Sequence, residues 1–388
     1  MYGFAVVVAP TIGPTLGGAI TDYSTWHWIF FINIPMGLLS LFLVSTFVRD
    51  PGEKEKRLKR HRSAHKADEL PFDLVGFVLI ALCLGSLEVV LDEGQRSDWF
   101  QSNFIIAFAA ISAIALLLFV PWELMRRKPL VNIRLLCTRQ FGMCFVMMLV
   151  TGGIIFSSIQ LLPQLVQSEF GYDATLAGLS LSPGGVVTMM VMPVAGYLTG
   201  KVQPKYLIAF GLAIVGLSMW TLTGLSPDLS FFYAAWTRMF TAAGLPFLFI
   251  PITTASYAGL KGADTNQAAG LINVARNLGG SIGLAMVQTS LQQRQQFHQS
   301  RLVEHAIPSN IHYQEAIRSA TQIFEGAHYT AIDATQRANA LVAQTIEKQA
   351  TLLSYIDTFW LLAILCAIAV PLAFTLRSIP LGKRQAAA

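Results

Sequence analysis

Residues 11–37 read TIGPTLGGAITDYSTWHWIFFINIPMG, and this stretch decides what kind of protein the chain forms. It places Gly13, Gly17 and Gly18 around Pro14 in an apolar run. In lipid, helices gain little by hiding apolar side chains, so small residues that let two backbones approach closely become a main source of helix association. Pro14 lacks a backbone N–H, which favours a bend. The stretch therefore predicts a bent, glycine-faced membrane helix, with tight packing alone as the simpler interpretation.

The composition points to a membrane protein. Of 388 residues, 54% are hydrophobic and 13% are charged, whereas charged residues make up about a quarter of an average soluble domain. The formal net charge of +5 would suit a nucleic-acid binder only if basic and aromatic residues gathered on a solvated domain. Here the basic residues lie between apolar segments, so we expect no nucleic-acid partner, and the lipid bilayer is the expected surrounding.

Apolar segments recur along the whole chain. A membrane-spanning helix needs about 20 mostly apolar residues, and about ten segments meet this requirement. They cover residues 1–22, 28–48, 72–92, 102–125, 140–162, 173–199, 206–225, 231–257, 266–290 and 353–377. The sequence therefore predicts an all-α, polytopic transmembrane bundle.

The distribution of Lys and Arg predicts the orientation, because basic loops stay on the cytoplasmic side. Residues 49–71 are rich in both types, whereas the short loops of the opposite side hold Arg96 alone. Over an even number of crossings this places both termini in the cytoplasm.

Neither a metal site nor an active site is indicated. The four cysteines lie in or beside apolar segments without zinc-like spacing. His298, His305 and His312 recur every seven residues, but Pro308 interrupts a continuous helix and no carboxylate completes a compact site. No Ser-His-Asp set and no phosphate-binding glycine loop is evident. We expect neither a cofactor nor an enzymatic activity.

The opening stretch resembles a known signature. Gly13, Pro14, Gly17 and Gly18 are similar to the antiporter motif on the fifth helix of the major facilitator superfamily. The residues that follow look like the EmrB/QacA-type fourteen-helix drug:proton antiporters of that superfamily; they are Trp26, Trp28, Ile29, Phe30, Phe31, Ile32, Asn33, Pro35 and Gly37. The resemblance implies a secondary active transporter that uses the proton gradient as its energy source.

The resemblance also implies a division of the chain. Residues 1–48 would be the remainder of an N-terminal bundle, 49–71 a basic cytoplasmic loop, 72–125 the extra helix pair of the fourteen-helix branch, 140–377 a C-terminal six-helix bundle with an external loop at 291–352, and 378–388 a cytoplasmic tail. The first four helices of the family would be absent, as in an N-terminally truncated member.

Polar residues inside apolar segments are candidates for a substrate or proton pathway, because such residues usually face a protein interior or an aqueous cavity. Gln160 and Gln164 lie one turn apart and predict a shared cavity. Arg238 lies about two turns inside its helix, and Asn273 and Arg276 share a stripe with glycines. A purely structural role, in packing or in pairing, is open for Arg238 and for the stripe.

The function implied by the resemblance is a multidrug efflux permease of the bacterial inner membrane. It would export small lipophilic or amphipathic compounds. A periplasmic adaptor protein and an outer-membrane channel are possible partners, through the external segment 291–352. The alternative is a transport-incompetent fragment that acts as a structural or partner subunit.

Overall fold

The computed structural model describes residues 2–47, 73–126, 129–225, 231–260 and 262–379, without the side chains of 2–12 and 262–263. The predicted basic loop at 49–71 and all but the start of the tail at 378–388 lie outside these residues. Within them, all regular structure is helical, which confirms the predicted fold class.

The first part of the chain forms two groups of helices. Before the undescribed loop come α1 (Tyr2–Tyr23), α2 (His27–Phe31) and α3 (Asn33–Phe47). After it come α5 (Leu74–Glu93) and α6 (Asn103–Met125), which pack against each other as an antiparallel pair. These two helices correspond to the segments that resemble the family's extra pair.

The rest of the chain forms the main bundle. Its helices are α7 (Arg139–Ser168), α8 (Ala174–Thr199), α9 (Pro204–Thr221), α10 (Phe231–Gly244), α11 (Pro246–Ser256), α12 (Gly262–Val303), α13 (Ile311–Gly326) and α14 (Ala331–Ala373). One predicted segment, 231–257, is divided into α10 and α11 because Pro246 has no N–H to continue the helical ladder.

Eight stretches of the described residues are long and apolar enough to cross a membrane, and α10 with α11 counts as one of them. The predicted segments that correspond to α1 and α12 are outside this set. Both nevertheless run along spanning helices, because α1 packs against α8 and α12 packs against α7 and α14. The face of α12 that these helices bury is mainly apolar and includes Leu271, Ile272 and Ala275, whereas Asn273 and Asn277 are exposed.

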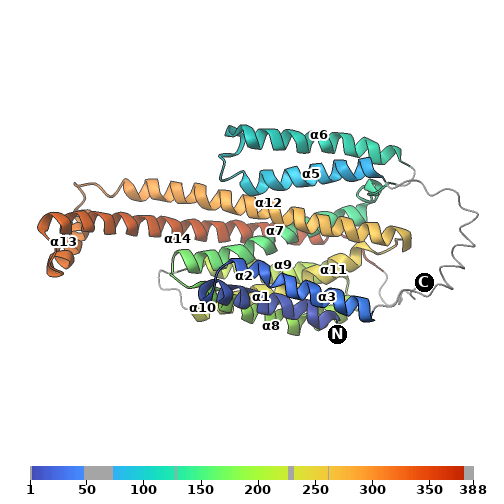
Figure 1. The fold of residues 1–388 in the computed structure, drawn as a ribbon, viewed down its shortest axis with the longest axis horizontal. Helices are drawn as coiled ribbons and strands as arrows, with labels where there is room; N and C mark the ends of the chain where they lie inside the picture. The colour runs from blue at the N-terminus through green and yellow to red at the C-terminus, as the bar shows by residue number, and fades with distance from the viewer. Residues whose placement is uncertain (1, 48–72, 127–128, 226–230, 261, 380–388) are drawn as a thin grey trace, which may run out of the picture.

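The helices lie roughly parallel, with the two smaller groups on opposite flanks of the main bundle (Figure 1). α5 and α6 lie against α12, and α1 lies against α8. α12 and α14 extend side by side well beyond the other helices, and α13 packs on α14 at the tip. The polar segment 291–352 is therefore largely a helical hairpin that continues two helices of the bundle.

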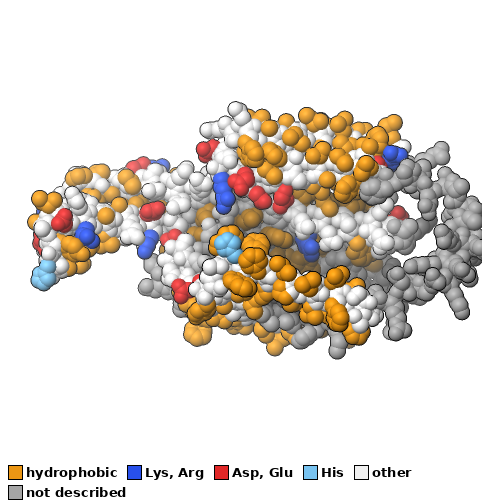
Figure 2. Space-filling view, viewed as in Figure 1, with side chains coloured by type: hydrophobic (Ala, Val, Ile, Leu, Met, Phe, Trp, Pro, Cys, Tyr) orange, Lys and Arg blue, Asp and Glu red, His pale blue; other side chains and the backbone are white. Residues whose placement is uncertain are grey.

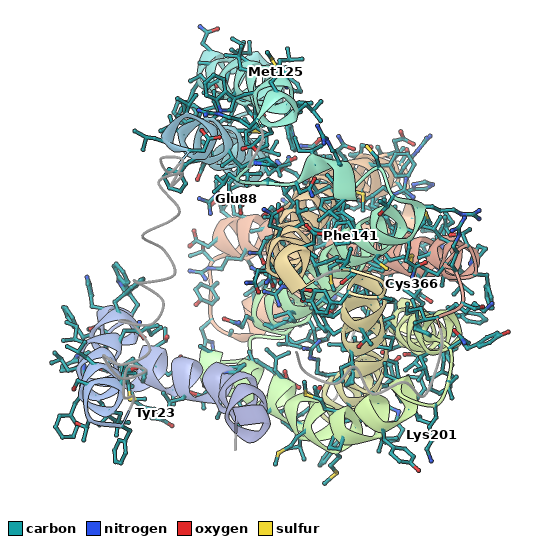
Figure 3. All side chains as sticks on the ribbon, turned by 90° about the vertical axis from the view of Figure 1, so that its right-hand side faces the viewer. Tyr23, Glu88, Met125, Phe141, Lys201 and Cys366 are labelled. Atoms are coloured by element: carbon teal, nitrogen blue, oxygen red, sulfur yellow. The ribbon has the colours of Figure 1, made fainter. Side chains whose placement is uncertain are left out.

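The core of the molecule lies in the main bundle. Its largest fully buried side chains include Phe141, Leu161, Leu212, Tyr355 and Phe359. Viewed along the helices, Phe141 and Cys366 lie inside this bundle, while Tyr23 and Met125 lie at the edges of the flanking groups (Figure 3). Apolar side chains also cover much of the outer surface (Figure 2), as a lipid-facing surface requires.

Candidate functional site

The glycines of the opening stretch form a close helix contact with α8. A Cβ on Gly18 would collide with the carbonyl group of Ala174, and a Cβ on Gly178 would collide with that of Pro14. Gly17 and Gly13 have open space around them. One glycine from each helix therefore removes the side chain that would hold the two backbones apart.

Polar groups on α1 add to this contact. The backbone N–H and hydroxyl of Thr175 both donate to Oδ2 of Asp22, at 2.7 and 2.6 Å. Asp22 thus supplies from α1 an acceptor for the first turn of α8, whose own N-cap residue Asp173 makes no side-chain cap. The hydroxyls of Thr15 and Ser182 are also hydrogen-bonded across the interface. The polar residues that α1 contributes, Thr15 and Asp22, lie two and four residues from the nearest motif glycine, and the sequence analysis missed them.

A second glycine contact joins α7 and α12. A Cβ on Gly279 would meet the carbonyl of Leu149, and one on Gly283 would meet the backbone of Gly153. Gly280 packs against the ring of Phe156 instead. The glycines of the stripe on α12 therefore serve close packing against α7.

Gln160 and Gln164 line one cavity, as their spacing predicts. The cavity measures about 580 Å³ and is enclosed by α7, α12 and the end of α5. Gln288 on α12 donates from Nε2 to Oε1 of Gln164 over 2.9 Å. The remaining polar lining includes Gln292 from α12 and Asp92, Glu93, Gln95 and Arg96 from α5 and the residues after it. Its size is within the common range of about 300–1,000 Å³ for small-molecule sites.

Hydrogen bonds fasten α5 to α12 beside this cavity. The hydroxyl of Ser281 donates to Oε1 of Glu88 over 2.6 Å, and the amide of Gln95 donates to that of Gln292. Glu88 points from α5 toward the main bundle (Figure 3). In the sequence, the only sign of this contact between α5 and α12 is the carboxylate of Glu88 inside an otherwise apolar segment.

Arg238 is partly buried and makes no hydrogen bond or ion pair to any described residue. Its Nε and Nη1 atoms are inaccessible to solvent and make no hydrogen bond to any described residue. A Cβ on Gly184 would come within 2.9 Å of Cγ of Arg238, so this glycine makes room for the arginine between α10 and α8. The pairing that would have given Arg238 a structural role is absent among the described residues, and Arg238 does not line the glutamine cavity.

Asn273 and Arg276 lie on α12 away from that cavity. Nδ2 of Asn273 donates to the carbonyl of Ala269 in its own helix, over 3.1 Å, and its side chain is exposed. Arg276 is half-buried, and its backbone carbonyl lies against Gly152 of α7. The structure therefore brings Gln160 and Gln164 together and leaves the three other candidates apart from them.

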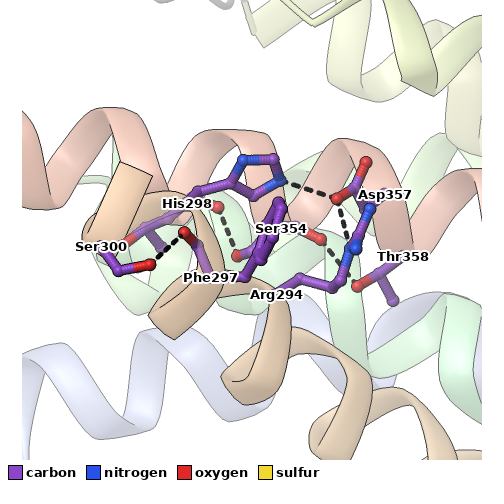
Figure 4. A network of polar contacts seen from close by, with 8 residues as sticks. Arg294, Phe297, His298, Ser300, Ser354, Asp357 and Thr358 are labelled. Atoms are coloured by element: carbon purple, nitrogen blue, oxygen red, sulfur yellow. Dashed lines mark hydrogen bonds and ion pairs between the residues drawn. The ribbon is translucent and has the colours of Figure 1, made fainter. Parts of the chain in front are cut away.

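An ionic network joins α12 and α14 at the base of the projecting hairpin (Figure 4). Oδ2 of Asp357 accepts from Nε of Arg294 at 2.6 Å and lies 2.7 Å from Nε2 of His298. The amide of Gln295 donates to the hydroxyl of Thr351 over 2.9 Å. His298 is therefore held by a carboxylate of α14, and no cluster of metal-ligating side chains occurs among the described residues.

Comparison with known proteins gives one consistent family. Residues 1–284 match the model of the Major Facilitator Superfamily. The chain is 31% identical over 364 residues to multidrug export protein EmrB of Escherichia coli K12, which covers 94% of this chain and 67% of that protein. It is 32% identical to EmrB of Haemophilus influenzae, over 93% of this chain and 67% of that protein. It is 28% identical to fatty acid resistance protein FarB of Neisseria gonorrhoeae, over 96% of this chain and 70% of that protein.

Proposed function

This chain belongs to the Major Facilitator Superfamily and is an EmrB-type transporter, not an enzyme, and on that premise we propose that it exports lipophilic or amphipathic compounds in exchange for protons. It is a multi-pass inner-membrane protein. The relatives named for multidrug export and for fatty acid resistance support a substrate range defined by apolar character.

The cavity between α5, α7 and α12 carries this proposal. It combines amide groups such as Gln160 and Gln164 with the apolar side chains of Leu91 and Leu284. Apolar contacts discriminate weakly between compounds of different shape, whereas strict hydrogen-bond requirements would narrow the range of substrates. Gln164 pairs with Gln288 and Gln95 pairs with Gln292, whereas the amide of Gln160 makes no hydrogen bond to a described residue. Gln160 is therefore the amide that is free to contact compounds of different shape beside the apolar wall.

The unpaired Arg238 is the strongest candidate for coupling. A buried cation without a counter-charge is costly in a membrane, and such a cost persists where function requires the group. We assign Arg238 a role in the proton or substrate pathway, with Asn273 and Arg276 as further polar positions along α12. Energy comes from the proton gradient, and no cofactor takes part.

The proposed orientation puts both termini in the cytoplasm and the hairpin of α12, α13 and α14 outside. Glutamates, glutamines and arginines cover much of this hairpin, and it projects beyond the ends of the other helices (Figure 1). A hairpin of this kind offers a docking surface to a periplasmic adaptor protein, which would in turn contact an outer-membrane channel.

A second candidate, a transport-incompetent structural or partner subunit, is favoured by one observation. None of the residues of α3 is buried, whereas every other candidate span has at least a fifth of its most apolar window buried. α3 thus has no face buried by the described residues, and helices of another polypeptide would cover it.

Efflux from proteoliposomes separates the two candidates. The purified chain is reconstituted alone, a lipophilic dye such as Nile red is loaded, and a pH gradient is imposed. Directional dye movement that depends on the gradient supports the exporter, with Arg238→Met as the variant expected to lose it. No movement by the chain alone, together with movement after a longer relative is added to the same liposomes, would favour the partner subunit.

A further inference from the structure

The outer end of α5 forms a wall of the glutamine cavity. Asp92 and Glu93 from its last turn line the same space as Gln160 and Gln164 of α7 and Gln288 of α12. α5 therefore contributes directly to the proposed substrate site, and the extra helix pair is more than a lipid-facing spacer between two bundles.

The charges on this wall do not cancel. Glu93 forms an ion pair with Arg96 at 3.6 Å, and Glu88 is engaged by the hydroxyl of Ser281. Asp92 has neither an ion pair nor a hydrogen bond to any described residue. The described lining of the cavity thus carries one negative charge in excess at Asp92. Acidic side chains gather at this end of α5 over α12, with a basic one beside them (Figure 2).

We infer that this cavity takes amphiphiles with a single positive charge and that Asp92 is their counter-charge; the inference rests on the proposed export function. The apolar side chains of Leu91 and Leu284 would contact the lipophilic part of such a compound, and the amides of Gln160 and Gln288 its polar groups.

The selectivity follows from electrostatics. A charge interacts more strongly beside low-dielectric protein than in bulk water, so Asp92 attracts a cation and opposes an anion of the same shape. Specificity arises from both effects, attraction of one class and repulsion of the other. Because the cavity is partly open, salt and water reduce the effect.

Binding of two ions of equal shape tests the inference. The whole chain is placed in nanodiscs of neutral lipid, and binding of tetraphenylphosphonium and of tetraphenylborate is measured by isothermal titration. The wild-type chain should bind the cation more tightly than the anion. Asp92→Asn should weaken cation binding about three- to tenfold and leave anion binding unchanged or tighter.

Two further variants make the test specific. Asp98→Asn removes the same charge a few residues away, outside the cavity, and Asp98 has the positive φ of 54° that Asn also accepts. It should bind both ions as the wild-type chain does. Gln160→Glu adds a third carboxylate to the lining, beside those of Asp92 and Glu93, and should tighten cation binding.

The outcomes are distinct from those of the export assay. Equal effects of Asp92→Asn and Asp98→Asn, equal losses for both ions, or no preference for the cation in the wild-type chain would overturn the inference. Nile red carries no charge, so its export by the same preparations decides the proposed function independently. A wild-type chain that exports Nile red but binds neither ion would refute the charge selectivity alone.

Discussion

The carbonyl of Pro14 in α1 occupies the place where a side chain on Gly178 of α8 would begin. Because Gly18 meets the carbonyl of Ala174 in the same way, the two backbones are fitted to each other at two levels, one turn apart on each helix. Motion of α1 relative to α8 during transport must preserve or break both contacts together.

Alanine substitutions of the two adjacent motif glycines should have different effects on the free energy of unfolding. Gly18→Ala inserts a methyl group into a contact with backbone, which cannot move aside, and should lower the free energy of unfolding by about 1–3 kcal/mol. Gly17→Ala meets open space and should leave it unchanged or raise it by up to about 1 kcal/mol, since alanine favours a helix over glycine. Thermal unfolding in detergent measures both. Equal destabilisation by the two variants would contradict the observed packing.

Two Arg→Met substitutions should change the free energy of unfolding in opposite directions. Arg238→Met removes a partly buried cation, two of whose nitrogens are inaccessible and have no partner among the described residues. The variant should raise the free energy of unfolding by about 1 kcal/mol, while export is lost. Arg294→Met removes the partner of Asp357 at a half-exposed site and should lower it by about 0.2–1 kcal/mol. Thermal unfolding and vesicle export are compared. A less stable Arg238→Met chain would show that the arginine has a structural partner after all.

Asp73 caps α5, and its charge makes that cap dependent on pH. Its carboxylate accepts the N–H of Gly76, and this bond, followed by the indole N–H of Trp122 and the charge of Arg126, holds the pKa of Asp73 below its usual range. A lowered pKa means that the stabilisation is present above the pKa of the unfolded chain and is lost as the pH falls through the lowered, folded value.

Replacement of Asp73 tests this cap. Asp73→Ala should cost about 1 kcal/mol at neutral pH, whereas Asp73→Asn keeps an acceptor oxygen and should cost less. Neither variant should share the wild-type loss of stability in strong acid. Unfolding of α5 and α6 followed by hydrogen exchange between neutral and acidic pH provides the measurement; an unchanged acid response in Asp73→Ala would exclude a contribution from this carboxylate.

Asp357 should control the base of the projecting hairpin. Because its Oδ2 serves both Arg294 and His298, Asp357→Asn removes the charge that attracts both and should increase hydrogen exchange in α13 and the outer halves of α12 and α14. Asp333→Asn, at the far end of α14, is the control and should leave exchange at the base unchanged. Equal protection in Asp357→Asn and the wild-type chain would show that packing alone joins the two helices.

Much of the fold could be predicted because membrane helices are encoded by composition over about 20 residues. The segments from 72–92 to 231–257 reappear as helices within a few residues of the predicted bounds, and the last of them is divided at Pro246. The segments 266–290 and 353–377 are parts of the much longer helices α12 and α14. The hairpin could not be predicted in detail: residues 291–352 are polar, and apolar periodicity is the main signal by which a helix is located. Its helical form depends on pairing between α12 and α14, which the sequence does not reveal.

The candidate site was only partly predictable. Gln160 and Gln164 were found because residues four apart share one face of a helix. Their partner Gln288 and the wall formed by Asp92 come from elements distant in the sequence, and no local pattern connects them. Asn273 and Arg276 followed the same helical logic, yet α12 turns them away from the cavity, since the rotation of a helix is set by its glycine contacts.

The most direct test of the proposed substrate route is to block the glutamine cavity chemically. Gln288→Cys is introduced with Cys137→Ser, because Cys137 is the exposed one of the native cysteines and Cys83, Cys144 and Cys366 are buried. A bulky thiol reagent is then applied to transporting vesicles, with and without substrate. The predicted result is labelling that substrate slows and that stops export. Export at an unchanged rate by fully labelled protein would contradict the assignment of this cavity to the transport path.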